Sequence, residues 1–191
     1  MKSSLQPLSD WQLAQAAQTI RSGGVIAYPT EAVWGLGCDP WDKDAVHRIL
    51  ELKQRPMEKG LIVVAGSVAQ IDFLLRPLPE AQRQIALSYW PGPVTCLIPD
   101  LEQQIPQTVR GRHSSIAVRV SDHPLIKALC GAIDGPLVST SANPAGRQPA
   151  RYSWQVRRYF QNRLDRLVPG NLGGHRKPSR IIDIVSGKQL R

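Results

Sequence analysis

Residues 53–65 read KQRPMEKGLIVVA, and the class of fold follows from this stretch. Before it, Ala45, Ile49 and Leu52 recur at helical spacing, which predicts a helix from Asp42 to about Lys53. Pro56 prevents the helix from continuing, and the apolar run from Leu61 to Ala65 is typical of a short buried strand. A helix, a charged loop and a buried strand in succession indicate an α/β protein.

The same alternation continues on both sides of this stretch. Further strands are predicted at Val25–Tyr28, Val94–Ile98, Ile116–Val120, Leu137–Thr140, near Leu167 and at Ile181–Val185. Further helices are predicted at about 9–22, 67–75, 79–89, 122–130 and 153–162. Because no internal repeat, low-complexity tract or linker interrupts this pattern, we predict one α/β domain over residues 9–191.

The net charge of +9 is unevenly distributed along the 191 residues. Residues 1–146 hold 13 basic and 13 acidic side chains, whereas residues 147–191 hold 11 basic ones against Asp165 and Asp183. Of the 24 basic residues 17 are arginine, whose forked guanidinium suits phosphate and carboxylate groups. The chain therefore has a neutral body and a basic C-terminal quarter.

Composition also narrows the class of protein. The 42% hydrophobic and 20% charged residues are typical of a globular protein, and no apolar run is long enough to span a membrane. We expect no secretory signal at the N-terminus. Cys38, Cys96 and Cys130 are odd in number and far apart, which argues against a disulfide framework or a zinc ribbon. We therefore expect a cytoplasmic protein that has no contact with a membrane.

Three cations gather between the helix and the strand of the opening stretch. Lys53, Arg55 and Lys59 lie on one short segment, which predicts a phosphate clamp held between two rigid elements. The alternative is a capped surface turn, because cations near a helix C-terminus are favoured by the helix dipole in any case.

Hydroxyl and amide side chains cluster where a later strand ends. The run Ser139-Thr140-Ser141-Ala142-Asn143 follows a buried strand, and ligands of open α/β sheets bind at such strand ends. The alternative is an ordinary turn closed by local bonds from side chains to the backbone.

The first loop, PTEAVWGLGCDP at residues 29–40, contains Gly35 and Gly37 but no dinucleotide fingerprint, and the chain has no GxxxxGK[ST] loop. The four histidines show no metal-ligand spacing and no Ser, His and Asp trio is evident, so we predict no metal site formed by protein ligands.

Five motifs together resemble one family. They are YPTEAVWGLGCDP, LKQRP with KGLIVVA, WPGPVT, SIAVRV with DHP, and VSTSANPAGR, and they occur in the order typical of the YrdC/TsaC family of threonylcarbamoyl-AMP synthases. The hallmark of that family, KxR followed later by SxN, corresponds to Lys53-Gln54-Arg55 and Ser141-Ala142-Asn143. The resemblance runs from about residue 9 to the C-terminus and implies a single domain with a twisted mixed sheet curled around a basic concave cavity.

The resemblance also implies a reaction. L-Threonine, bicarbonate and ATP, with Mg²⁺ expected to accompany the ATP, would give threonylcarbamoyl-AMP and pyrophosphate through a nucleotidyltransferase activity. The product supplies the threonylcarbamoyl group of the modified adenosine in tRNAs that read codons beginning with A. Short bacterial members of the family work with the separate transfer proteins TsaB, TsaD and TsaE.

The resemblance assigns roles residue by residue. Lys53 and Arg55 are expected to be catalytic. The residues expected to bind ATP are Arg55, Lys59, Ser115, Ser141, Asn143 and Arg191. The residues expected to bind threonine are Thr30, Arg119, Ser139 and Ser179. Two positions depart from the pattern of many relatives: Ala32 replaces a second threonine after Thr30-Glu31, and Lys59-Gly60 stands where many relatives have Asn-Pro.

A second class of function uses the basic C-terminal quarter. Its arginines could serve a protein that binds double-stranded RNA or tRNA, or a ribosome-maturation factor, and such binding should weaken steeply with salt. A solvated basic surface that aids solubility is the alternative interpretation of the same residues.

Overall fold

A computed structural model describes residues 8–174 and 179–190 of the chain. The helices are α1 (Asp10–Arg21), α2 (Lys43–Lys53), α3 (Asp72–Leu75), α4 (Glu80–Tyr89), α5 (Gln107–Arg110), α6 (Pro124–Ile133) and α7 (Ser153–Phe160). The strands are β1 (Ile26–Pro29), β2 (Trp34–Gly37), β3 (Ile62–Ala65), β4 (Val94–Pro99), β5 (Ser115–Val120), β6 (Leu137–Ser141), β7 (Arg166–Leu167) and β8 (Arg180–Asp183). Short 3₁₀ turns lie at Met57–Lys59, Val68–Ile71 and Gln161–Arg163.

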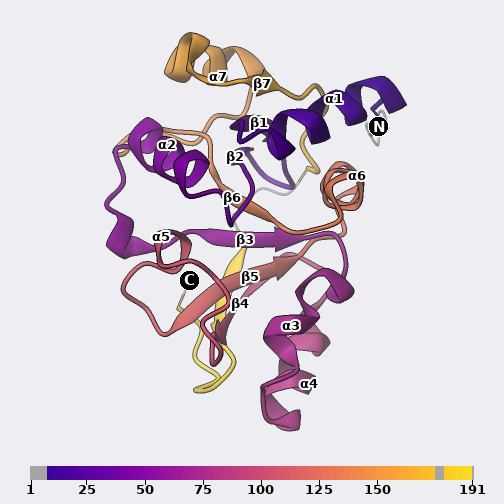
Figure 1. The fold of residues 1–191 in the computed structure, drawn as a ribbon, viewed down its shortest axis with the longest axis vertical. Coiled ribbons are helices and arrows are strands. Elements are labelled where there is room, and N and C mark those ends of the chain that lie inside the picture. The colour runs from indigo at the N-terminus through magenta and orange to yellow at the C-terminus, as the bar shows by residue number, and fades with distance from the viewer. Residues whose placement is uncertain (1–7, 175–178, 191) are drawn as a thin grey trace.

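The strands form one mixed sheet of eight strands in the order β7-β1-β2-β6-β3-β5-β4-β8. β3 pairs with β5 in parallel, whereas β6 pairs antiparallel with both β2 and β3. β8, close to the C-terminus, pairs in parallel with β4 and so brings the end of the chain beside its middle. The predicted single α/β domain with a mixed sheet is confirmed (Figure 1).

Helices cover both faces of the sheet. The alternation of side chains along β3 sends Val63 into a cluster with Ile49 of α2, and Val64 into a cluster with Ile126 of α6. Helix α1 packs beside α6 on that second face, as Figure 1 shows at the upper right. Because both faces are apolar, the strands read as near-continuous hydrophobic runs, which explains why the sequence predicted most of them.

The first loop differs from its prediction. Residues 29–40 were expected to be a polar loop, but Trp34–Gly37 form β2, which pairs antiparallel with β1. The two glycines concealed this strand, because glycine is depleted in strands and marks turns in most sequences. The loop prediction is therefore wrong for Trp34–Gly37, whereas Thr30 and Glu31 lie in the turn between β1 and β2 and residues 38–40 follow β2 outside any strand.

Helix α1 begins at Asp10, within the helix predicted at about residues 9–22, and a capping box closes its N-terminus. Ser9 Oγ accepts a hydrogen bond from the Gln12 amide, and the Gln12 side chain accepts one from the Ser9 amide. Among the helices of the described part of the chain, none has the length and the apolar character that crossing a membrane requires.

Candidate active site

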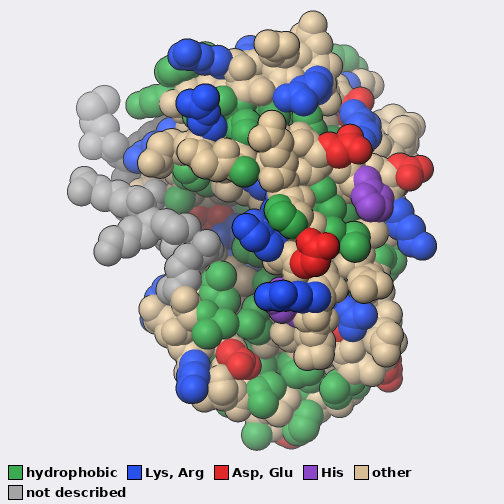
Figure 2. Space-filling model, turned by 90° about the vertical axis from the view of Figure 1, so that its left-hand side faces the viewer, with side chains coloured by type: hydrophobic (Ala, Val, Ile, Leu, Met, Phe, Trp, Pro, Cys, Tyr) green, Lys and Arg blue, Asp and Glu red, His purple; other side chains and the backbone are tan. Residues whose placement is uncertain are grey.

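A cavity of about 510 Å³ lies where β3, β5 and β6 face the turn after β1. Its volume falls in the usual range for pockets that bind small molecules. Four cations line it (Arg55, Lys59, Arg110 and Arg119), and Glu31 is the one acidic residue among the described lining residues. The lining is therefore basic, as the family resemblance implied, and Figure 2 shows a hollow in this face of the molecule with charged side chains inside it.

Strand alternation places the polar groups in the cavity. Along β5, Ile116, Val118 and Val120 are buried in the core, while Ser115, Ala117 and Arg119 are half-buried and line the cavity. The neighbouring strands are in register, with Ile62 of β3 opposite both Ala117 of β5 and Ser139 of β6. One surface of three adjacent strands thus carries the predicted side chains, although their residues are far apart in the sequence.

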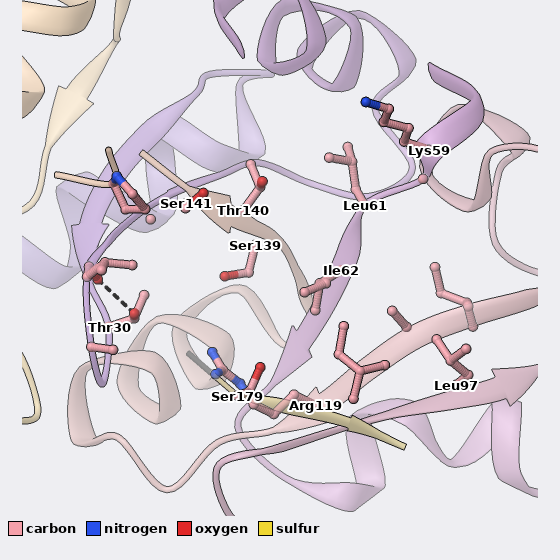
Figure 3. A pocket seen from close by; sticks show the side chains of 18 of the residues that line it. Thr30, Lys59, Leu61, Ile62, Leu97, Arg119, Ser139, Thr140, Ser141 and Ser179 are labelled. Carbon is pink, nitrogen blue, oxygen red and sulfur yellow. Dashed lines mark hydrogen bonds between the residues drawn. The ribbon is translucent and has the colours of Figure 1, made fainter. Parts of the chain in front are cut away.

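The structure brings most of the predicted residues together. The large cavity is lined by Thr30, Arg55, Lys59, Ser115, Arg119, Ser139, Ser141 and Ser179. Lys53 and Asn143 line an adjoining cavity of about 290 Å³, which shares Arg55, Lys59, Thr140 and Ser141 with the first. Arg191 lies outside the described residues. In Figure 3, Lys59 stands at one end of the large cavity, and Thr30, Arg119 and Ser179 lie at the other.

The Arg55 guanidinium is fixed by the turn that follows it. Its Nε and Nη2 donate to the Gly60 carbonyl at 3.1 and 2.9 Å, and Nη2 also donates to the Lys59 carbonyl at 3.2 Å. Gly60 has a φ of +61°, and a Cβ there would lie 2.7 Å from the Arg110 carbonyl oxygen. The departure to Lys59-Gly60 thus provides a glycine at a backbone position that a side chain would strain.

Lys53 is buried, with only 5% of its surface exposed. Its Nζ donates hydrogen bonds to the carbonyls of Ser141 and Asn143, the latter at 2.9 Å, and the Ala145 amide donates back to the Lys53 carbonyl at 2.7 Å. Burial, with a further contribution from the nearby Arg55 charge, lowers the Lys53 pKa to about 8. The ammonium group therefore holds the segment after β6 in place.

The side chains of the SxN motif form hydrogen bonds within the turn that contains it. Ser141 Oγ donates to Asn143 Oδ1 at 2.6 Å, and Asn143 Nδ2 donates to the carbonyls of Pro144 and Arg147 at 3.1 and 2.7 Å. These are the local bonds of the turn that the sequence offered as an alternative to ligand binding. The two interpretations are compatible, because Ser141 also lines both cavities.

At the end of the large cavity that lies away from Lys59, hydroxyl groups form hydrogen bonds with neighbouring residues. Thr30 Oγ1 donates to the Val33 carbonyl at 2.7 Å, the bond drawn as a dashed line in Figure 3. Ser179 Oγ is 2.9 Å from Thr95 Oγ1, and either can be the donor. Arg119 forms an ion pair with Glu31, with 3.1 Å between Nη2 and Oε2. This end of the cavity offers hydroxyls and one buried pair of opposite charges.

Sequence reasoning missed several residues of this site, among them Arg110 in the lining of the cavity, Glu31 and Tyr28. Glu31 was noted only as part of the first loop, although its place beside Thr30 could have drawn attention to it. Tyr28 was assigned to a strand alone, yet its phenol is fully buried and donates to Ser139 Oγ at 2.9 Å. Burial raises the Tyr28 pKa, so the phenol stays protonated and its hydrogen bond leaves the Ser139 proton available for another acceptor.

The Tyr28 ring also explains the two glycines of β2. A Cβ at Gly37 would lie 2.8 Å from Tyr28 Cε1, and a Cβ at Gly35 would lie 3.6 Å from Tyr28 Cζ. The Gly-Leu-Gly run lets the β2 backbone pass close over the ring, which a larger residue at position 37 would prevent. These glycines therefore serve packing at the site.

The described residues that line the two cavities include no cysteine. In residues 8–174 and 179–190, no group of three or more His, Cys, Asp or Glu side chains is arranged to hold a metal ion. All three cysteines are buried, and burial raises the pKa of Cys96 and Cys130 to about 12, which leaves both thiols protonated. A Mg²⁺ ion that entered with a nucleotide would depend mainly on phosphate oxygens.

Comparisons with known proteins agree with one another. The chain is 72% identical over 180 residues to the threonylcarbamoyl-AMP synthase of Marinobacter nauticus, covering 94% of this chain and 95% of that protein. It is 56% identical over 184 residues to the protein of the same name from Stutzerimonas stutzeri, covering 96% and 98%. The crystal structure of P. abyssi Sua5 complexed with L-threonine is similar with a TM-score of 0.86 and 30% identity.

That alignment covers 97% of this chain and 55% of the Sua5 chain, so this chain spans about half of that longer relative. The structure of E. coli YciO is also similar, with a TM-score of 0.78 at 23% identity over 94% of this chain and 86% of YciO, which shows a shared fold. The model of the Sua5/YciO/YrdC family, described as telomere recombination, matches residues 18–191. The sheet, the cavity and these matches together place the chain in the Sua5/YciO/YrdC family.

Proposed function

We propose that this chain is a threonylcarbamoyl-AMP synthase that converts L-threonine, bicarbonate and ATP into threonylcarbamoyl-AMP and pyrophosphate. The observation that carries the proposal is that one cavity contains cations at one end and a hydroxyl-rich end with an Arg–Glu pair at the other. The two relatives that are 72% and 56% identical over almost their whole length have this name.

The chemistry requires little covalent help from the protein. The amine of threonine and bicarbonate give a carbamate with loss of water, and a carbamate oxygen then attacks the α-phosphorus of ATP. The bond between the α-phosphorus and the bridging oxygen breaks, and pyrophosphate leaves with the electron pair. Negative charge gathers on phosphate oxygens in the transition state, so positioned cations are the main catalytic resource of such a site.

We assign Arg55 and Lys59 to the triphosphate. Arg55 is held by the carbonyls of residues 59 and 60, so its guanidinium is already oriented before the nucleotide arrives. Ser115 and Ser141 line the same cavity and would contact the nucleotide, as would Asn143 from the adjoining cavity. Arg191 stays an expectation from the sequence, and MgATP is the expected form of the nucleotide substrate.

Lys53 would act differently from Arg55. Because its Nζ is bonded to two backbone carbonyls of the SxN segment, we assign it as a positioning residue that fixes Ser141 and Asn143. Thr30, Arg119, Ser139 and Ser179 would bind threonine, with the Arg119 guanidinium facing the carboxylate.

The decisive experiment is mass-spectrometric detection of threonylcarbamoyl-AMP after incubation of the purified protein with MgATP, L-threonine and bicarbonate. Pyrophosphate release should depend on both threonine and bicarbonate. Lys53→Ala and Arg55→Ala should each lower the rate by a factor equivalent to at least ~2 kcal/mol of transition-state stabilisation. Pyrophosphate release that does not depend on threonine would overturn the proposal.

A secondary proposal concerns RNA. Around α7, Arg147, Arg151, Arg157, Arg158 and Arg163 are exposed, and the exposed rings of Tyr152 and Trp154 stack with 6.2 Å between centroids. Exposed arginines suit the phosphates of tRNA or double-stranded RNA, and exposed aromatic rings suit the unpaired bases of tRNA. On the face shown in Figure 2, acidic side chains lie among the basic ones. Binding of tRNA that falls steeply between low and moderate salt would support the contact, and salt-independent or absent binding would contradict it.

The cellular setting follows from the same proposal. The product would pass in the cytoplasm to the transfer proteins TsaB, TsaD and TsaE, which attach the threonylcarbamoyl group to tRNA. Threonylcarbamoyl-AMP is a mixed anhydride, so its consumer must transfer the acyl group to the adenosine amine before water reacts with it.

A further inference from the structure

Glu31 is an acidic residue in a basic cavity, and none of the roles above uses it. It follows Thr30 in the turn between β1 and β2, lines the large cavity, and has only 5% of its surface exposed. A carboxylate is rarely buried unless its oxygens are paired. The partners of its two oxygens therefore indicate what the residue does.

One oxygen of Glu31 is fixed and the other is left for a further donor. Ser121 Oγ donates to Oε1 at 2.5 Å, and Ser121 Oγ is itself held by the His123 amide at 3.0 Å. Within residues 8–174 and 179–190, Oε2 accepts no hydrogen bond, although Arg119 Nη2 lies 3.1 Å from it. Arg119 Nε is likewise buried without a hydrogen-bond partner among those residues.

Two adjacent buried groups of opposite charge thus each keep an unused hydrogen-bonding position. Such positions are costly, and a ligand that fills both would recover the cost. An α-amino acid carries an ammonium and a carboxylate on the same carbon, which is the complement of a neighbouring Glu and Arg. Nearby His123 does not supply the missing charge, because burial lowers its pKa and leaves its ring neutral at pH 7.

We propose that Glu31 Oε2 accepts a hydrogen bond from the α-ammonium group of L-threonine, while Arg119 binds the carboxylate. Glu31 is then a specificity residue that selects an amino acid over a hydroxy acid or a simple carboxylate. The hydrogen bond from Ser121 Oγ to Oε1 fixes the Glu31 carboxylate, and the ion pair holds it beside Arg119, so that the two charges can face the two charged groups of one amino acid. This inference rests on the proposed function, since it takes L-threonine as the substrate.

The test compares two ligands and three proteins. The ligands are L-threonine and (R)-3-hydroxybutanoate, which keeps the carboxylate and the hydroxyl but has no amine. The proteins are the wild type, Glu31→Gln, and the control Glu80→Gln, which removes an exposed carboxylate from α4. Dissociation constants are measured by calorimetry at pH 7, and thermal melting confirms that each protein is folded.

We expect the wild type and Glu80→Gln to bind threonine more tightly than 3-hydroxybutanoate by about tenfold or more, the usual effect of a charged hydrogen bond. Glu31→Gln should lose most of this ratio by binding threonine more weakly, with little change for 3-hydroxybutanoate. If Glu31 acted only by orienting Arg119, both ligands would weaken equally and the ratio would persist, which overturns the proposal.

The wild type alone also tests the idea, should Glu31→Gln fail to fold. Equal affinity of the wild type for the two ligands would overturn the role of Glu31 and leave the synthase activity intact. A wild type that neither binds threonine nor forms threonylcarbamoyl-AMP would overturn the proposed function itself.

Discussion

The pH dependence of folding should reveal the buried ammonium of Lys53. This side chain is 5% exposed, and its Nζ is bonded to the carbonyls of Ser141 and Asn143. Lys53→Met replaces the aliphatic stem of the side chain by an unbranched apolar one and removes the titrating group. The variant leaves two carbonyls without their donor, a cost that does not vary with pH.

The size of the effect follows from the pKa. Burial lowers the Lys53 pKa from 10.5 to about 8, so the native state disfavours the charged form by about 3 kcal/mol. Between these two pKa values the unfolded chain binds the proton and the native chain does not, so wild-type stability rises with pH in this window. From pH 7 to pH 9 the gain in the free energy of unfolding is about 1 kcal/mol, and it is lost again as the pH falls through 8.

Urea unfolding at pH 7, 8 and 9 measures this gain as the difference between the wild type and Lys53→Met. Groups that titrate in both proteins cancel in that difference. Lys43→Met, which removes an exposed lysine from the same helix, shows whether the loss of a positive charge by itself has any effect. Parallel profiles for the wild type and Lys53→Met would refute a buried Lys53 with a lowered pKa.

Two further substitutions test the site and its support. Tyr28→Phe deletes the donor to Ser139 Oγ and should raise the KM for threonine about fivefold while leaving the KM for ATP unchanged; equal changes in both would indicate a general loss of structure. Gly60→Ala places a Cβ 2.7 Å from the Arg110 carbonyl at a φ of +61°, so thermal unfolding should show a loss of more than ~1 kcal/mol. An unchanged melting temperature would contradict the strain at that position.

The sequence predicted the elements with strong local signals. Helix α1, helix α2 with its apolar face, and strand β5 each lie close to the residues at which the sequence predicted them. These predictions succeeded because each depends on neighbours within a few residues. The strand β2 was missed because its pattern depends on the Tyr28 ring beneath it, which is a contact between two strands.

Net charge was a poor guide to the site. The basic excess lies in residues 147–191, whereas the described cations that line the large cavity (Arg55, Lys59, Arg110 and Arg119) all belong to the part of the chain whose charges balance. The cavity is basic because folding brings these four side chains to one lining, whose described residues include a single carboxylate, that of Glu31. Local placement, which composition does not record, sets the electrostatics of the site.

Thus the sequence by itself determined the α/β class, the succession of most helices and strands, and, through its ordered motifs, most of the candidate site residues. Only the tertiary structure decided how these residues interact. Lys53 is buried and donates hydrogen bonds to two backbone carbonyls, Tyr28 donates one to Ser139, and Glu31 forms an ion pair with Arg119. The reason is physical. Secondary structure follows from local periodicity, whereas hydrogen bonds, burial and ion pairs between distant segments exist only after the sheet brings those segments together.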